Sequence, residues 1–169
     1  MEVMGELLLR GAALDDVAAI HAIYSDQVLT GTASWEYDPP TLIEMTTRVS
    51  GILAAGFPYF VAEQMGAVVA YAYASSWRSR IGYRFTVEDS IYVREEHRGQ
   101  GIGRVLLNHL LQACATAGYK HVIAVIGDSA NVGSIKLHRA CGFEHAATFK
   151  NVGYKFDRWL DSVQMQRVL

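Results

Sequence analysis

The chain carries a glycine-rich segment with a basic residue at each end. The segment reads Arg98-Gly99-Gln100-Gly101-Ile102-Gly103-Arg104 and lies between an extended stretch and an amphipathic helical stretch. Glycines at alternate positions leave main-chain N–H groups uncovered, and a helix that starts here adds unpaired N–H groups and partial positive charge. Such a corner favours a phosphate or pyrophosphate, with Arg98 and Arg104 adding charge at its rim. The alternative is a flexible loop that is merely rich in glycine.

The glycine spacing argues against two common phosphate-binding motifs. No Gly-Lys-Ser/Thr follows, so the segment is not a nucleotide P-loop. The pattern Gly-x-Gly-x-Gly lies past the middle of the chain, and no acidic residue ends the next expected strand, His121–Ile126. It is therefore a poor match to the dinucleotide-binding fingerprint.

The residues in and around this segment resemble a known family. Arg98-x-x-Gly101-x-Gly103 matches the Q/R-x-x-G-x-G/A signature of the GNAT superfamily of acetyl-CoA-dependent N-acetyltransferases, and Asn131…His138…Gly142-Phe143 resembles the second part of its cofactor region. Further segments are similar to the phosphinothricin/methionine sulfoximine acetyltransferase family: Trp77-Arg78-x-Arg80, Thr86-Val87-Glu88, Ser90-x-Tyr92-Val93, Leu137-His138-Arg139 and Gly153-Tyr154-Lys155-Phe156…Trp159.

The resemblance implies acetyl-CoA as co-substrate, whereas the spacing of the histidines and cysteines leads us to expect no metal. The glycine segment would bind the CoA pyrophosphate, and the backbone of Ile91, Tyr92 and Val93 would pair with the pantetheine arm. One N–H of this strand would face the thioester oxygen, a donor worth roughly 3–4 kcal/mol in a dry site. Asn131 would cap the last helix and contact the cofactor, and Ser134, one turn later, could reach the same arm.

Glu88 is the candidate general base. An amine is partly protonated at neutral pH, and a carboxylate acting directly or through water can remove that proton. Apolar and aromatic neighbours would bury Glu88 partly and raise its pKa. The alternative is a solvated strand residue paired with Arg84. Asp89 faces the opposite side of a regular strand and is the weaker candidate.

His138 is the second catalytic candidate. Many GNAT enzymes have a tyrosine here that protonates the CoA sulfur, whereas the phosphinothricin-type family has histidine. The imidazole could act as a general acid or as a hydrogen-bond partner of CoA or substrate. The alternative is a helix histidine near the surface. No histidine or cysteine of the chain shows metal-ligand spacing.

Basic and aromatic residues are candidates for the acceptor site. If Trp77-Arg78-Ser79-Arg80 is extended, Arg78 and Arg80 share a face and can clamp a carboxylate or phosphinate. The alternative is a solvated basic turn. Tyr83 could line the same mouth. Trp35, in the loop after the first helix, could pack against the substrate or be a packed surface tryptophan.

Hydrophobic periodicity predicts the elements that hold these residues. Strands are expected at Glu6–Arg10, Pro58–Glu63, Ala67–Ser75, Tyr83–Val93, His121–Ile126, Glu144–Lys150 and Asp161–Leu169. Helices are expected from Leu14 to Val28, from Pro39-Pro40-Thr41 to about Ala55, after Gly103 as far as Gly118, and over Asn131–Cys141. The order strand, helix, buried strand implies parallel pairing, so the fold class is α/β, a mixed sheet with helices on both faces. The resemblance adds a mostly antiparallel sheet whose central parallel strands are splayed.

Length and composition indicate a single soluble domain. The 169 residues hold 15 Lys+Arg and 17 Asp+Glu, a net charge of −2, and 51% are hydrophobic. This argues against a disordered chain and against a nucleic-acid partner. We expect one domain over 1–169 with residues 1–5 as a loose extension, no membrane span, no signal peptide and a cytoplasmic location. The resemblance implies a homodimer, although no sequence feature marks its interface.

The first function hypothesis is acetyl transfer from acetyl-CoA to the α-amine of a small amino acid or analogue. The resemblance implies phosphinothricin, methionine sulfoximine or methionine sulfone. The second keeps the cofactor but changes the acceptor to another amine, a polyamine, an antibiotic or a protein N-terminus. The arginine pair argues against a polyamine, which it would repel. The third is a non-catalytic module that senses acyl-CoA.

Overall fold

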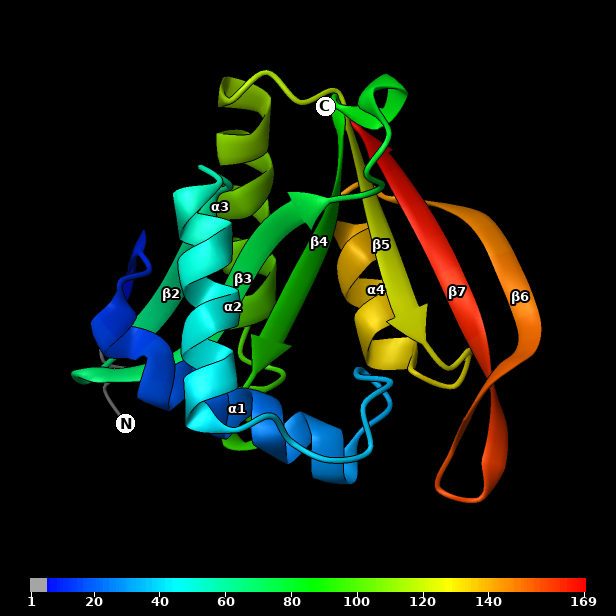
Figure 1. The fold of residues 1–169 in the computed structure, drawn as a ribbon, viewed down its shortest axis with the longest axis horizontal. Helices are drawn as coiled ribbons and strands as arrows, with labels where there is room; N and C mark the ends of the chain where they lie inside the picture. Colours follow the sequence, from blue (N-terminus) through cyan, green and yellow to red (C-terminus); the bar gives the residue numbers. More distant parts are fainter. Residues whose placement is uncertain (1–5) are drawn as a thin grey trace.

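The computed structural model describes residues 6–169, so the expected extension at residues 1–5 lies outside the described part. One seven-stranded sheet with the order β1-β2-β3-β4-β5-β7-β6 runs through the molecule (Figure 1). Its strands are β1 (Leu7–Gly11), β2 (Tyr59–Gln64), β3 (Ala67–Ser76), β4 (Thr86–Val93), β5 (His121–Gly127), β6 (Glu144–Lys155) and β7 (Arg158–Val168). Neighbouring strands are antiparallel except β4 and β5, which are parallel.

Helices cover both faces of this sheet, as the sequence predicts (Figure 1). α1 (Val17–Thr30) and α2 (Leu42–Ala54) lie on one face, and α3 (Ile102–Thr116) and α4 (Val132–Ala140) on the other. Each pair has its own apolar core, around Ile20 and Val49 on one side and around Leu106 and Leu110 on the other. None of the helices within residues 6–169 is long and apolar enough to cross a membrane.

The pairing of β4 with β5 stops partway along both strands. Its register runs from Thr86 opposite His121 to Asp89 opposite Ala124. β4 nevertheless continues to Val93 and β5 to Gly127, and the two strands diverge in Figure 1. Past Asp89, β4 is paired on its β3 side only. The fold is thus a mixed, mostly antiparallel α/β sheet with a splayed parallel pair, as expected.

Some element limits differ from those expected. Leu14–Asp16 forms a 3-10 turn, and the α-helix begins only at Val17. Asp16 explains the turn, since its carboxylate accepts a hydrogen bond from the Ala13 N–H at 2.8 Å and so caps this end. Tyr83 belongs to a second 3-10 turn (η2, Ile81–Tyr83) rather than to a strand.

The last hairpin is longer than the sequence indicates. We expected strands at Glu144–Lys150 and Asp161–Leu169, but β6 continues to Lys155 and β7 begins at Arg158. The turn consists of Phe156 and Asp157, with φ values of 53° and 55°. Two positive φ values are usually marked by Asn-Gly or Asp-Gly, and Phe-Asp does not carry that signal.

Candidate active site

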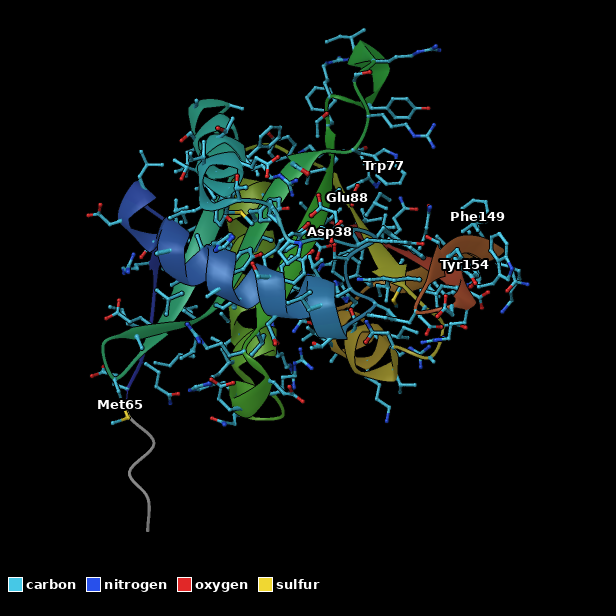
Figure 2. The ribbon with its side chains drawn as sticks, turned by 60° about the horizontal axis from the view of Figure 1, so that its bottom comes forward. Asp38, Met65, Trp77, Glu88, Phe149 and Tyr154 are labelled. Carbon is cyan, nitrogen blue, oxygen red and sulfur yellow. The ribbon has the colours of Figure 1, made fainter. Side chains whose placement is uncertain are left out.

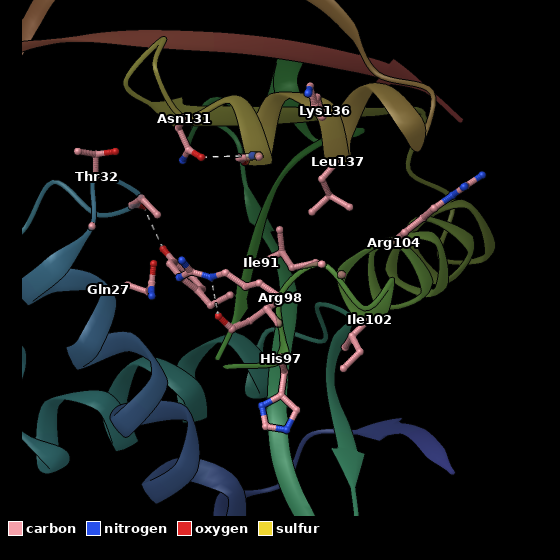
Figure 3. A pocket seen from close by; sticks show the side chains of 18 of the residues that line it. Gln27, Thr32, Ile91, His97, Arg98, Ile102, Arg104, Asn131, Lys136 and Leu137 are labelled. Carbon is pink, nitrogen blue, oxygen red and sulfur yellow. Dashed lines mark hydrogen bonds between the residues drawn. The ribbon is translucent and has the colours of Figure 1, made fainter. Parts of the chain in front are cut away.

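A cavity of about 680 Å³ opens where β4 and β5 separate (Figure 3). It is bounded by the end of β4, the glycine-rich segment and the first turns of α3 and α4. Of the cofactor-binding candidates, all but one line it: Ile91, Tyr92, Val93, Arg98, Gly99, Gly101, Ile102, Gly103, Arg104, Asn131 and Ser134. The exception, Gln100, donates from Nε2 to the Glu96 carbonyl at 3.1 Å instead.

The glycine-rich segment forms a cradle of main-chain N–H groups. Gly99 and Gly101 have φ values of 73° and 84°, a conformation that side chains with a Cβ rarely adopt. Val105 donates its N–H to the Gly101 carbonyl at 3.1 Å, so the three N–H groups before it, at 102–104, lack partners inside α3. A Cβ on Gly103 would lie 3.3 Å from Leu137 Cδ2, so this glycine lets α3 approach α4 closely.

Basic side chains surround the same cavity. Arg98, Arg104, Lys136 and Arg158 line it, and the one lining carboxylate, Asp128, is paired with Arg158 at 2.9 Å. This excess of positive charge and the exposed N–H cradle suit the phosphates of CoA. The unpaired edge of β4 gives an extended arm a place to add main-chain hydrogen bonds. The residues present therefore fit acetyl-CoA.

A second cavity, of about 290 Å³, adjoins the first. Glu88 and His138 both line it, and Ile91, Asn131 and Ser134 line both cavities. The structure therefore brings the two catalytic candidates together beside the inner end of the expected cofactor cleft.

Glu88 is half-buried at the wall of this second cavity. Burial, followed by the charge of Asp89, raises its pKa to about 7. Within residues 6–169 no ion pair joins Glu88 to Arg84, whose guanidinium lies 4.4 Å from the centre of the Phe85 ring. Near neutral pH such a carboxylate is present in both protonation states and can accept a proton from an amine.

His138 is buried rather than near the surface. Its Nε2 lies 3.0 Å from Asp89 Oδ2, and Nδ1 donates to the Ser134 carbonyl at 2.8 Å. Burial lowers the pKa of His138, but the Asp89 carboxylate and the two hydrogen bonds outweigh it and raise the pKa above its usual value. Asp89 thus favours the protonated form of the imidazole, and both ring nitrogens have hydrogen-bond partners.

The acceptor-site candidates lie in two separate places. Trp35 lines the second cavity with Glu88. Arg78, Ser79, Arg80 and Tyr83 instead line an exposed hollow on the loop that carries η2 and projects beyond the sheet, past Trp77 in Figure 2. The segment from 77 to 80 is not a strand, so the condition for a shared strand face is not met. The Arg78 guanidinium lies 5.4 Å and 5.6 Å from the Trp77 and Tyr83 ring centres.

Several residues of the cofactor cleft were not expected from the sequence. Gln27, Asp128, Lys136 and Arg158 line the first cavity. Gln27 is a buried polar residue on the apolar face of α1. A polar residue at an apolar position of the helical pattern is a signal by which the sequence could have identified it as a site residue. Arg158 carries no comparable signal, because only the hairpin brings it to the cleft. Among residues 6–169 no group of three or more His, Cys, Asp or Glu side chains is placed to hold a metal ion.

Comparisons with known proteins agree with this geometry. Residues 9–164 match the family model described as an acetyltransferase (GNAT) domain. The chain is 50% identical over 155 residues to a phosphinothricin N-acetyltransferase of Alcaligenes faecalis, covering 92% of this chain and 79% of the relative. It is 39% identical to an L-methionine sulfoximine/L-methionine sulfone acetyltransferase of Salmonella typhimurium, covering 95% and 93%.

A solved structure is similar over almost the whole fold. It is a GNAT superfamily phosphinothricin acetyltransferase from Sinorhizobium meliloti in complex with AcCoA, with a TM-score of 0.93 and 48% identity, covering 96% of this chain and 88% of that chain. The splayed strands, the N–H cradle and these similarities lead to one conclusion: this chain belongs to the GNAT family of acetyltransferases.

Proposed function

We propose that the chain acetylates the α-amine of a small amino acid or amino-acid analogue of the phosphinothricin, methionine sulfoximine or methionine sulfone type. The observation that carries this is Glu88, whose pKa is raised to about 7 in a cavity that opens into the cleft fitted for acetyl-CoA. The names of the relatives at 50% and 39% identity support the substrate class.

Main-chain groups do most of the cofactor binding in this proposal. The N–H groups at 102–104 and the Arg98 guanidinium hold the pyrophosphate, and the free edge of Ile91–Val93 pairs with the pantetheine arm. When bound, acetyl-CoA supplies the acetyl group as an activated thioester. Asn131 caps α4 by accepting from the Ser134 N–H at 3.2 Å, which keeps both side chains at the cleft.

Glu88 and the end of β4 carry out the chemistry. Glu88 accepts the proton of the substrate ammonium and leaves a neutral, nucleophilic amine. A main-chain N–H of Ile91–Val93 stabilises the negative charge that develops on the carbonyl oxygen under attack. His138 lines the same cavity as Glu88, and its hydrogen bonds with Asp89 and the Ser134 carbonyl fix the orientation of its ring beside the reacting groups.

Residues of two loops select the acceptor in this proposal. Arg78 and Arg80, with Ser79 and Tyr83 beside them, attract acidic acceptors and repel polyamines. Trp35 packs against the body of the substrate in the second cavity. This division of roles disfavours the alternative of a polyamine acceptor.

We further propose that residues 1–169 act as one domain in a cytoplasmic homodimer. The end of the β6–β7 hairpin exposes a row of large apolar side chains, of which Phe149 and Tyr154 are labelled at the edge of Figure 2. The exposed set is Phe149, Val152, Tyr154, Phe156 and Trp159. Exposed apolar side chains gathered on one edge hairpin support contact with a second copy.

Release of free thiol from acetyl-CoA with a panel of amines tests the function. Wild-type protein should release thiol with methionine sulfone or phosphinothricin, and activity should rise as the pH increases through about 7, because Glu88 acts in its deprotonated form. Glu88→Gln should lower kcat by about 10²–10⁴-fold and leave acetyl-CoA affinity unchanged. Glu144→Gln, at an exposed position on β6, is the matched control.

The same panel separates the alternatives. Release only with polyamines, antibiotics or peptides would assign a different acceptor. Calorimetric binding of acetyl-CoA without release for any amine would indicate a sensing module. Equal activity of Glu88→Gln and wild type would remove Glu88 from the mechanism.

A further inference from the structure

The segment Gly153–Trp159 is one of the family-like motifs, and of its residues only Arg158, which lines the cofactor cavity, has been given a part in the active site above. It forms the tip of the β6–β7 hairpin, far from the glycine-rich segment in the chain. Its neighbour in space is the loop of residues 31–38 between α1 and α2, here called the acceptor loop. Ala33, Ser34, Trp35 and Glu36 of this loop line the second cavity together with Glu88.

Lys155 joins the hairpin tip to the acceptor loop. Only 3% of this lysine is exposed, and its Nζ donates to the carbonyls of Gly31 and Ser34, both at 2.9 Å. In the part of the chain that is described, Lys155 forms no ion pair. Burying an ammonium group is costly unless its hydrogen bonds are satisfied. Movement of either carbonyl away from Lys155 Nζ would therefore destabilise the fold. Burial correspondingly lowers the pKa of Lys155.

Further contacts attach the acceptor loop to the hairpin tip and to the end of β5. The Tyr37 hydroxyl donates to the Tyr154 carbonyl. The Trp35 ring fills the space where a Cβ on residue 153 would stand, so only glycine fits there. At the start of the loop, the Thr32 hydroxyl donates to the Gly127 carbonyl at 3.2 Å, at the end of β5.

We propose that Lys155 is a positioning residue that holds the acceptor loop in the shape that forms the acceptor cavity. Its two hydrogen bonds fix both ends of the stretch from Gly31 to Ser34. Ala33 and Ser34 of this stretch line the acceptor cavity, whereas Gly31 to Ala33 line the edge of the cofactor cavity. The hairpin tip therefore determines, through Lys155, how well the acceptor amine is placed against Glu88. Its other basic residue, Arg158, lines the cofactor cavity instead. This inference rests on the proposed function for the meaning of the cavity.

Lys155→Met tests the proposal, because it keeps the length of the side chain and removes the donors. Lys120→Met, at an exposed lysine just before β5, is the matched control. We expect the KM for methionine sulfone to rise about tenfold or more, since small misplacements of a reactant are costly. The Kd of Lys155→Met for acetyl-CoA should change less than its acceptor KM, because only the edge of the cofactor cavity is formed by residues 31–33. Thiol release by Lys120→Met should stay at the wild-type value. Hydrogen exchange of the amides at 31–38 should become faster in Lys155→Met alone.

Tyr37→Phe is a second, milder variant at an exposed side chain, and it should change acceptor KM and loop exchange in the same direction. If Lys155→Met folds and leaves both quantities unchanged, the proposal is overturned. If Lys155→Met does not fold, unchanged values in Tyr37→Phe overturn it. A failed proposed function has a different signature: wild-type protein releases no thiol with any amine, while hydrogen exchange still reports whether Lys155 holds the loop.

Discussion

Two consecutive carboxylates of β4 have different surroundings. Both line the second cavity, but Glu88 is half-buried without an ion pair among residues 6–169, whereas Asp89 is buried and bonded to His138. Successive side chains of a strand point to opposite faces, so the sequence could predict this division. It could not predict the partner, because His138 lies 49 residues away on a helix whose placement depends on tertiary packing. The same limit applies to Lys155, which pattern alone would place on the surface.

Replacing Asp89 should change the pH dependence of the free energy of unfolding, because Asp89 is paired with His138. The folded-state pKa of His138 is raised above its unfolded value, so the pair contributes full stability below about pH 6.5. That contribution is lost as the pH rises through the folded-state pKa of His138. Asp89→Asn should therefore lower the free energy of unfolding by about 1–3 kcal/mol near pH 6, and by less at higher pH.

Urea denaturation across this pH range measures the difference. Asp157→Asn is the control, since Asp157 is exposed in the hairpin turn and asparagine tolerates its positive φ. A destabilisation by Asp89→Asn that does not vary with pH would mean that His138 is not the titrating partner.

The elements differ in how far the sequence specifies them. α3 was predictable because its leucines recur at helical spacing and Gly118 follows its end. The start of α2 was also visible, as Thr41 and Glu44 form a capping box. The tip of the last hairpin was not, because Phe156 and Asp157 take positive φ values without glycine or asparagine. The expectation of an extended segment at Arg78 and Arg80 was wrong for a related reason, because the chain leaves the strand before these residues.

Two glycine substitutions should have opposite effects on stability. Gly101→Ala places a Cβ at a φ of 84° and should destabilise the fold by about 1–2 kcal/mol while weakening acetyl-CoA binding. Gly51 lies in the last turn of α2, where a Cβ would meet no atom within 4 Å. Gly51→Ala should stabilise the fold by about 0.5–1 kcal/mol and leave binding unchanged.

Thermal unfolding and calorimetry measure these two effects. Equal acetyl-CoA affinity in Gly101→Ala and wild type would show that the cradle does not depend on this backbone conformation. Destabilisation by Gly51→Ala would contradict the open surroundings of that helix position.

The sheet as a whole is interrupted at its centre, because β4 and β5 stop pairing after Asp89 and Ala124. An extended ligand arm in this gap would supply the missing hydrogen bonds. Acetyl-CoA at about 100 times its Kd should therefore stabilise the folded protein by about 2.7 kcal/mol. Hydrogen exchange should slow at Ile91–Val93, on the open edge of β4.

Adenosine 3′,5′-bisphosphate is the matched control, since it has phosphates but no arm. At equal saturation it should raise the melting temperature comparably, yet leave exchange at Ile91–Val93 fast. Slow exchange with both compounds would show that filling the phosphate cradle alone closes the gap.

The gap between β4 and β5 links the rate at which the protein is degraded to the amount of cofactor that can fill the gap. Release of CoA leaves the end of β4 without a partner on its β5 side, and proteases act on molecules that open. In a cell with little acetyl-CoA and little free CoA, most copies would have this gap open. We therefore expect depletion of both forms of the cofactor to shorten the half-life of this protein, so that it is degraded faster when it has no acetyl group to transfer.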